Sequence, residues 1–216
     1  MVKIERTPVP PASLAIERKK ANGSYREPDV IRQLCHDFHG KCYLCEMDEL
    51  QSIEVEHLRP HGGDVERKFR WDNLFYSCAH CNSVKNQRKY HNMILDCCEI
   101  DPETVLEQQF IEGHVQVKPL DKTREARMTA VLLTECFELT NTGIREYECQ
   151  TRVNTLSVTM ATLYKALEKY RADPSNRNLR TLRGMLSRTY KFAGFTRTYV
   201  RNHLDKYPHL AEYVRV

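Results

Sequence analysis

Two pairs of cysteines, each with Cys-x-x-Cys spacing, constrain the fold of this chain more than any other feature. The first pair is Cys42 and Cys45, and the second is Cys78 and Cys81. The tight turn of each pair can direct two thiolates toward one ion, and two such turns complete the tetrahedral sulfur site that zinc prefers. Because four thiolates leave no open coordination position, the sequence predicts a structural zinc ion that holds two distant loops together.

The other cysteines and the hydropathy of the chain exclude several classes of protein. Nine cysteines could indicate a secreted disulfide framework or a redox protein, but the number is odd, and neither an export signal nor a thioredoxin-like βαβ pattern is found. No stretch approaches the roughly 18 apolar residues of a membrane span. We therefore expect a cytoplasmic metal-binding protein without a membrane partner. His80 is expected on the surface, and five cysteines are expected to be ordinary buried thiols: Cys35, Cys97, Cys98, Cys136 and Cys149.

The distribution of prolines and apolar residues divides the 216 residues into three parts. Prolines and charges predict an extended arm over residues 1–28. Residues 29–119 contain short elements separated by turns, with a core at 42–91. Residues 120–216 show helical spacing and predict a separate helical lobe for interactions. The fold class expected is α+β, mainly α.

The first helix and the elements that follow it are read from spacing and turn residues. A helix from about residue 29 to 38 would place Val30, Leu34 and Phe38 on one face and end at Gly40. Beyond it the pattern predicts a strand, a polar loop, a second strand and a helix, with the strands at about 53–58 and 71–76.

Three long helices are expected in the last part of the chain, at about 122–140, 143–172 and 176–204. The clearest apolar stripe belongs to the second and is expected in the core: Val153, Leu156, Met160, Leu163, Tyr164 and Leu167. Residues 171–206 hold nine basic residues against two aspartates, which indicates either a solvated face or a surface for nucleic acid or an acidic partner. The nine are Arg171, Arg177, Arg180, Arg183, Arg188, Lys191, Arg197, Arg201 and Lys206.

Between and around the two cysteine pairs lie the segments EVEHLRPH (54–61), WDNL (71–74) and CNSVK (81–85). In order, spacing and flanking cysteines, these segments resemble the HNH endonuclease family, in which an acidic residue and a histidine close one strand, an asparagine follows the loop, and a histidine or asparagine lies on the next helix. The resemblance covers residues 42–91 and implies a ββα-metal catalytic module. Asn82 stands where many members of the family have histidine.

The resemblance also implies a role for each matching residue. Phosphodiester hydrolysis needs a base for the attacking water, a cation beside the phosphate and a proton for the leaving oxygen. His57 would be the base, since the usual pKa of histidine lies near 6.5. Glu56 and Asn82 would hold one hard divalent ion, Mg²⁺ or Mn²⁺. Asn73 would fix the loop and so orient His57.

Four further residues are candidates for contacts with phosphate. His61 could contact the phosphate or the metal ion, or could only cap its loop. Lys85 and Arg88, together with Lys89, follow Asn82 and could hold backbone phosphates without reading bases, or could only be solvated.

Over its whole length the chain resembles the HNH subunits, called PtuB, of the Septu anti-phage defence systems, which also accompany some retrons. The shared features are Lys3-Ile4 with a proline-rich start, CYLCE (42–46), EVEHLRP (54–60), WDNLFYSCAHCNSVK (71–85) and a helical second half. The resemblance implies an antiviral effector that works with a PtuA-like ABC-type ATPase, and it allows a higher-order complex. The helical lobe would then dock the ATPase, and its last basic helix could contact either the ATPase or nucleic acid.

A non-catalytic zinc module that binds nucleic acid or tethers partners would explain the four cysteines equally well. It gives no reason for Glu56, His57, Asn73 and Asn82 to appear at this spacing, and we therefore favour a nuclease. DNA is the expected substrate and RNA the alternative, because such a site grips a phosphate and not a base.

Overall fold

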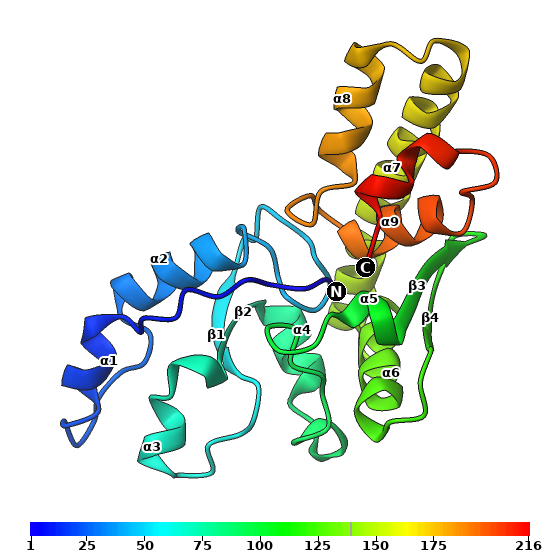
Figure 1. Ribbon diagram of the computed structural model, residues 1–216. Coiled ribbons are helices and arrows are strands. Elements are labelled where there is room, and N and C mark those ends of the chain that lie inside the picture. Colours follow the sequence, from blue (N-terminus) through cyan, green and yellow to red (C-terminus); the bar gives the residue numbers. More distant parts are fainter. Residues whose placement is uncertain (139) are drawn as a thin grey trace.

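The computed structural model describes residues 1–138 and 140–216 and has a mixed α+β fold in which helices predominate (Figure 1). Two small antiparallel sheets are present in this part of the chain, and each has two strands. Strand β1 (Ile53–His57) pairs with β2 (Leu74–Cys78), and β3 (Leu106–Ile111) pairs with β4 (His114–Pro119). The predicted α+β class is confirmed.

The N-terminal segment is ordered and packs against the body. Residues 1–11 run extended, and helix α1 (Ala12–Glu17) follows within the stretch that was predicted to be extended to residue 28. Met1, Val2 and Ile4 are buried, and the Ile4 N–H donates to the carbonyl of Cys97 at 2.9 Å. The arm is therefore part of the core.

Helix α2 (Pro28–Asp37) forms as its sequence predicts. Pro28 occupies the first turn, where a missing N–H costs nothing. Val30, Leu34 and Phe38 are completely buried, and Gly40 has a φ of +68°, a left-handed conformation that suits the end of a helix. The helix packs against β2 and leads the chain to the first cysteine pair.

Strands β1 and β2 are joined by a long loop and followed directly by a helix. The loop contains the short helix α3 (Val65–Lys68) and a 3₁₀ turn (Trp71–Asn73), and α4 (Ala79–Lys85) begins at the end of β2. The second strand was predicted at 71–76 and begins three residues later, because the 3₁₀ turn takes up the first three positions. A second 3₁₀ turn (Arg88–Tyr90) lies beyond α4.

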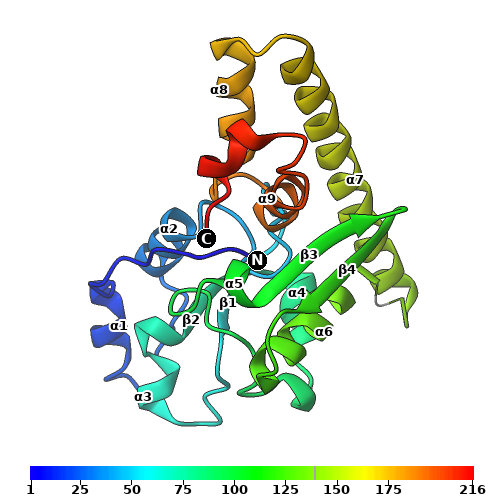
Figure 2. The same ribbon diagram turned by 45° about the vertical axis from the view of Figure 1, so that its right-hand side comes forward.

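The β3–β4 hairpin was not anticipated. It follows the short helix α5 (Pro102–Val105), and its turn is formed by Glu112 and Gly113, whose φ angles are 52° and 85°. Positive φ at both central residues is the geometry of a type I′ turn, which favours Asn-Gly and tolerates Glu poorly. Helix α6 (Arg124–Glu138) covers this hairpin (Figure 2).

The helical second half differs from the sequence prediction in its last segment. Helix α7 (Gly143–Ala172) has the predicted bounds, but residues 176–204 form two helices, α8 (Asn176–Met185) and α9 (Ala193–Arg201). The segment between these two helices ends at Phe192, which is fully buried and has a φ of +51°. A 3₁₀ segment (Pro208–Tyr213) follows. The C-terminal end of α7 projects from the body together with α8 (Figure 1). Within the described ranges, none of the helices has the length and hydropathy to cross a bilayer.

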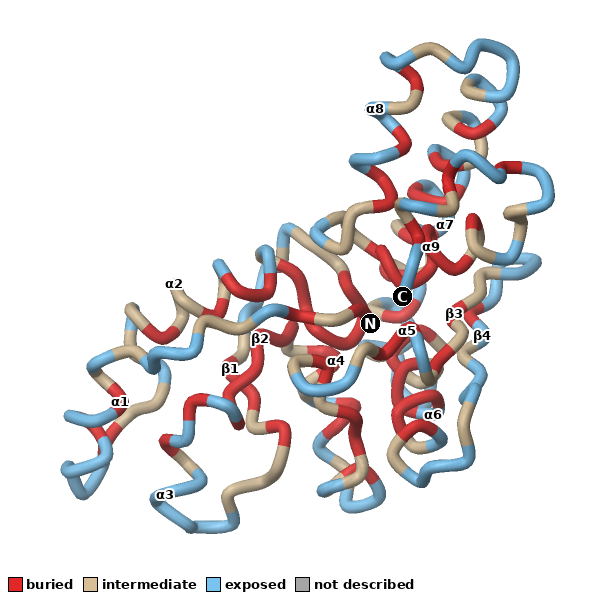
Figure 3. The backbone as a smooth tube through the Cα atoms, viewed as in Figure 1, coloured by how far each residue is buried: buried red, intermediate tan, exposed pale blue. Residues whose placement is uncertain are grey.

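One hydrophobic core runs through the molecule. It extends from Met1 to Val214 and includes side chains on both sides of the predicted boundary at residue 120. Buried residues gather in β2, α4 and α6 (Figure 3). From the predicted stripe on α7, Leu156, Met160, Leu163 and Leu167 are buried in this core, while Val153 and Tyr164 are half-buried at its edge.

A buried carboxylate accounts for part of the basic charge of the last segment. The side chain of Glu103 is 1% exposed and accepts hydrogen bonds from Arg188 Nε (3.0 Å), Arg197 Nε (2.8 Å) and Arg201 Nη1 (2.9 Å). Arg188 also pairs with Asp101. These three arginines were predicted to belong to a basic face, but they form an internal ion network because Glu103 lies beneath them.

Candidate active site and metal centre

The four cysteines of the two pairs form one compact cluster. Their Sγ atoms all lie within 4.8 Å of one another, and all four residues are buried. A zinc ion with four Zn–S bonds near 2.3 Å requires neighbouring sulfurs about 3.8 Å apart, so small side-chain movements would suffice to bind it. The loop after α2, the end of β2 and the first turn of α4 contribute the ligands. These side chains fit a closed tetrahedral zinc site.

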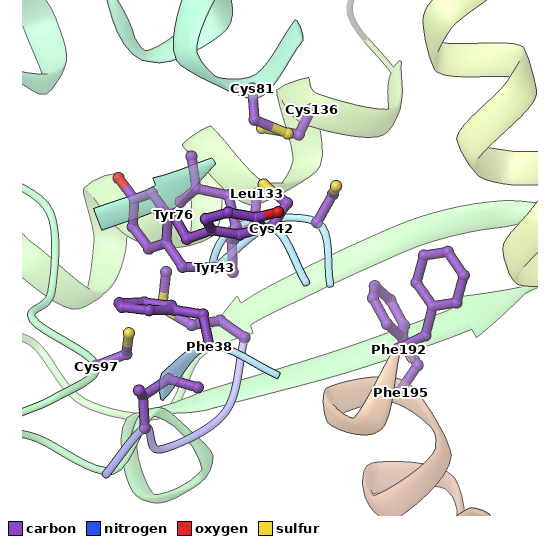
Figure 4. Close-up of a cluster of buried hydrophobic side chains, with 14 of the residues drawn as sticks. Phe38, Cys42, Tyr43, Tyr76, Cys81, Cys97, Leu133, Cys136, Phe192 and Phe195 are labelled. Atoms are coloured by element: carbon purple, nitrogen blue, oxygen red, sulfur yellow. The ribbon is translucent and has the colours of Figure 1, made fainter. Parts of the chain in front are cut away.

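The helices of the second half close this cluster on its outer side. Arg152 of α7 is buried, and its Nη2 donates to the Sγ of Cys78 at 3.2 Å. Hydrogen bonds from the other three cysteines of the cluster, together with this guanidinium, hold the pKa of the Cys78 thiol far below its usual value. In Figure 4 the side chain of Cys136, from α6, lies beside Cys81. The Cys78 sulfur can therefore carry negative charge, whereas hydrogen bonds with Cys42 and Cys78 raise the pKa of the Cys45 thiol and burial raises the pKa of the Cys81 thiol.

His80 is buried where α4 packs against α6, and it does not lie on the surface, where it was predicted. It is 8% exposed, and its Nε2 donates to the carbonyl of Cys136 at 3.0 Å. The first turn of α4 faces α6, and a side chain between the two cysteine ligands is buried by that contact. The spacing of a Cys-x-x-Cys pair shows which residues can bind a metal ion, but it does not show which helix packs against the turn.

A polar cavity of about 420 Å³ lies beside β1 and α4. It brings together Glu56, His57 and Asn82, which the sequence predicts as catalytic or metal-binding residues. The phosphate candidates His61 and Lys85 also line it. The remaining lining residues were not anticipated from the sequence: Tyr25, Pro60, Gly62, Asn86 and His91.

His57, the last residue of β1, is held in one tautomer. Its Nε2 lies 2.9 Å from the carbonyl oxygen of Lys68, and because a carbonyl can only accept, Nε2 carries the proton. In the neutral ring Nδ1 is then the basic nitrogen. Burial of the ring lowers the pKa of His57 below its usual value, and the charges of Lys85 and Lys68 also lower it. The ring is therefore ready to accept a proton at neutral pH.

Asn73 fixes the loop that supplies the Lys68 carbonyl. Its side chain is buried, its Oδ1 accepts from the Arg59 N–H at 2.8 Å, and its Nδ2 donates to the carbonyls of Arg59 (2.9 Å) and Arg67 (3.3 Å). The amide thus ties the beginning of the loop to the residue that precedes Lys68. Asn73 does not line the cavity and acts on it through the backbone.

Glu56 and Lys85 form a buried ion pair at the floor of the cavity. Lys85 Nζ lies 2.5 Å from Glu56 Oε1 and donates to the carbonyl of His57 at 3.0 Å, and both side chains are 5% exposed. Burial raises the pKa of the Glu56 carboxyl, and the Lys85 ammonium opposes this rise. Lys85 was predicted as a phosphate contact, but its ammonium is directed at the carboxylate instead.

The remaining phosphate candidates differ in position. His61 lies against His57, with ring centroids 4.8 Å apart, and its Nδ1 accepts from the N–H of Gly63 at 3.2 Å. Arg88 is exposed on the 3₁₀ turn after α4 and does not line the cavity, and Lys89 pairs with Glu135 at 2.5 Å. Of the four candidates, His61 and Lys85 belong to the cavity.

The cavity offers oxygen ligands for a hard cation. The Glu56 carboxylate and the Asn82 amide oxygen are the donor types that Mg²⁺ and Mn²⁺ prefer, and both side chains line one cavity. A cation bound there would either share the Glu56 carboxylate with the Lys85 ammonium or displace that ammonium from it.

The fold and the site together define a mixed α+β protein with a four-cysteine cluster that could hold a metal ion, next to a polar cavity. No protein-family model matches the chain, and no curated protein matches it.

Proposed function

We propose that this protein is a metal-dependent endonuclease of the HNH type, with β1, β2 and α4 as its ββα-metal module. The observation that carries the proposal is the cavity, which combines an oxygen-donor pair with a histidine of fixed tautomer. Neither a zinc module for binding alone nor a dithiol redox protein needs this combination.

The residues of the cavity can divide the hydrolysis of a phosphodiester between them. His57 Nδ1 takes a proton from the attacking water, and the Lys68 carbonyl holds the ring while it becomes positively charged. The Lys85 ammonium, 2.5 Å from the Glu56 carboxylate, opposes the rise in its pKa that burial causes. Glu56 and Asn82 would hold Mg²⁺ or Mn²⁺, which supplies charge stabilisation at the phosphate and the leaving oxygen.

The cysteine cluster would have a structural role in this enzyme. A zinc ion on Cys42, Cys45, Cys78 and Cys81 joins the end of β2 and the start of α4 to the loop after α2. Zinc binding to such sites is coupled to folding and contributes on the order of 10 kcal/mol. The ion would therefore fix the helix that carries Asn82 and Lys85.

The biological role we propose is that of a cytoplasmic effector in anti-phage defence, acting with a PtuA-like ABC-type ATPase. The resemblance of the whole chain to the Septu HNH subunits supports this role. Two exposed features of the helical half suit interactions. Arginines at 177, 180 and 183 are exposed on α8, and Ile144 and Tyr147 of α7 are 80% and 73% exposed. DNA is the expected substrate.

The test is cleavage of plasmid DNA and of total RNA by purified protein with Mg²⁺, with and without the ATPase. His57→Ala should abolish cleavage while zinc content and circular dichroism remain those of the wild type. His209→Ala, at an exposed histidine outside the cavity, is the matched control and should cleave normally. If the folded, zinc-bound protein cuts neither substrate with the ATPase present, the chain is a binding module.

A further inference from the structure

Tyr25 reaches the candidate active site from a part of the chain that contains none of the HNH-like motif. It lies in the loop between α1 and α2, lines the cavity, and packs against His57. The two ring centroids are 4.5 Å apart, and the rings are inclined at 69°. This edge-to-face arrangement is one that aromatic rings favour.

Two contacts join the residues on either side of Tyr25 to β1, which carries His57, and to the loop that follows it. Before it, the Gly23 carbonyl accepts from Lys68 Nζ at 2.8 Å. After it, Arg26 Nη2 lies 2.7 Å from Glu54 Oε2 on β1. The position of Tyr25 is therefore fixed from both sides.

The conformation of this loop depends on a glycine. A Cβ atom at Gly23 would lie 1.8 Å from the carbonyl oxygen of Glu17, so only glycine allows the chain to turn this closely beneath α1. The Glu17 carboxylate also accepts from the Ser24 N–H at 3.0 Å. The loop is thus shaped by α1 before it reaches the cavity.

Lys68 connects the loop and the histidine. Its backbone carbonyl accepts from His57 Nε2, and its ammonium donates to Gly23. His57 therefore has three restraining contacts: a hydrogen bond fixes one edge of its ring, and the rings of Tyr25 and His61 pack against it. Hydrogen bonding alone would leave the ring free to tilt about that bond.

We propose that Tyr25 is a positioning residue of the nuclease site, whose aromatic ring holds His57 in the orientation that faces the cavity. This role rests on the proposed function. The ring performs it and the hydroxyl does not, since the contact with His57 is between rings. Phenylalanine should therefore replace tyrosine, and alanine should not.

The expected kinetic effect is a change in turnover and not in substrate binding. A misplacement of a catalytic group by about 1 Å can lower the rate about 100-fold. We expect Tyr25→Ala to lower kcat by about 10- to 100-fold with KM changed by less than about threefold, and Tyr25→Phe to keep kcat within about threefold. Val158→Ala, at an exposed residue on α7, should have no effect.

The experiment combines these kinetics with aromatic ¹H–¹³C NMR spectra of the zinc-bound protein at one fixed pH. The His57 ring signal, assigned from its loss in His57→Gln, should shift in Tyr25→Ala, because the ring current of Tyr25 disappears, and should stay nearly unchanged in Tyr25→Phe. An unmoved signal in folded Tyr25→Ala overturns the contact. A raised KM with unchanged kcat overturns positioning in favour of substrate contact. No cleavage by the wild type overturns the proposed function and this role together, and the NMR spectra then show whether the contact itself exists.

Discussion

Asn73 offers the sharpest test of how the loop after β1 serves the site. Its amide makes three hydrogen bonds to the backbone of Arg59 and Arg67, and its side chain is buried. Asn73→Ala removes all three. Since a typical hydrogen bond contributes a net 0.5–1.5 kcal/mol, three give roughly 1.5–4.5 kcal/mol, and partial access of water to the loop backbone favours the middle of that range, about 3 kcal/mol.

The same substitution should also slow catalysis. Without Asn73 the loop no longer fixes the Lys68 carbonyl, and His57 loses the acceptor that sets its tautomer. We expect a fall in kcat of about 100-fold, as for other displaced catalytic groups. Asn73→Asp should be at least as harmful, because it turns the Nδ2 donor into an oxygen that faces two carbonyls in a buried position.

The assays are urea unfolding of the zinc-saturated protein at pH 7 and cleavage kinetics on the same preparations. Asp72→Ala is the matched control, since Asp72 is the exposed neighbour of Asn73 and pairs with the exposed Arg70. Its unfolding free energy should change by less than about 1 kcal/mol. A loss below about 1 kcal/mol in Asn73→Ala together with full activity would refute the reasoning, because it would mean that other contacts hold the loop.

Four further predictions follow from the structure. Glu103→Gln should lower the free energy of unfolding by about 3–5 kcal/mol in urea, because it removes the buried charge that compensates three arginines, whereas Glu168→Gln, in an exposed pair with Arg171, should cost less than about 1 kcal/mol; equal effects would contradict the buried network. The cleavage rate should rise with pH as His57 loses its proton and should reach half its maximum below pH 6.5, because burial lowers the pKa of His57; a midpoint above 6.5 would be inconsistent with His57 as the base. Chelation of zinc, or Cys81→Ser, should unfold the protein, measured by circular dichroism together with metal content; a native spectrum without metal would show that the cluster is not needed for folding. If α8 binds duplex DNA, replacing Arg177, Arg180 and Arg183 by glutamine should reduce the slope of log K against log salt by about 2–3, while Arg188→Gln should leave it unchanged because Arg188 is paired internally; an unchanged slope in the triple variant would exclude α8 as the DNA contact.

The parts of the fold that depend on local sequence could be predicted. Helix α2 and helix α7 were found where apolar spacing, Pro28 and Gly40 place them, because these signals act within a few residues. The β3–β4 hairpin was missed because its type I′ turn uses Glu112-Gly113 in place of a favoured pair such as Asn-Gly. The break before α9 was missed because Phe192 adopts a left-handed conformation in which its ring is buried. Packing in the core stabilises this conformation, and the local sequence does not indicate it.

The candidate site also contains some residues that the sequence predicts and others that only tertiary packing reveals. The four cysteines and the cavity residues Glu56, His57 and Asn82 come from motifs whose spacing is visible in the sequence, and the structure brings each set together. Tyr25 and His91 line the same cavity without any spacing signal, since only tertiary packing brings them there. The pairing of Lys85 with Glu56 was likewise hidden, because a lysine one helical turn beyond Asn82 reads as a solvated cation until its burial is known.

The contacts between the zinc cluster and the helices of the second half determine how this protein can be dissected. A fragment that ended near residue 121 would lose Arg152 and Cys136, which cover the cysteine cluster, and would lose the carbonyls of Arg188 and Tyr190 that receive the buried ammonium of Lys41. Such a fragment would expose the cysteine cluster to solvent, so failure to bind an ATPase or to cut DNA would report misfolding. Partner binding is better mapped by single substitutions at exposed positions, such as Ile144→Asp, which leave that shared interior intact.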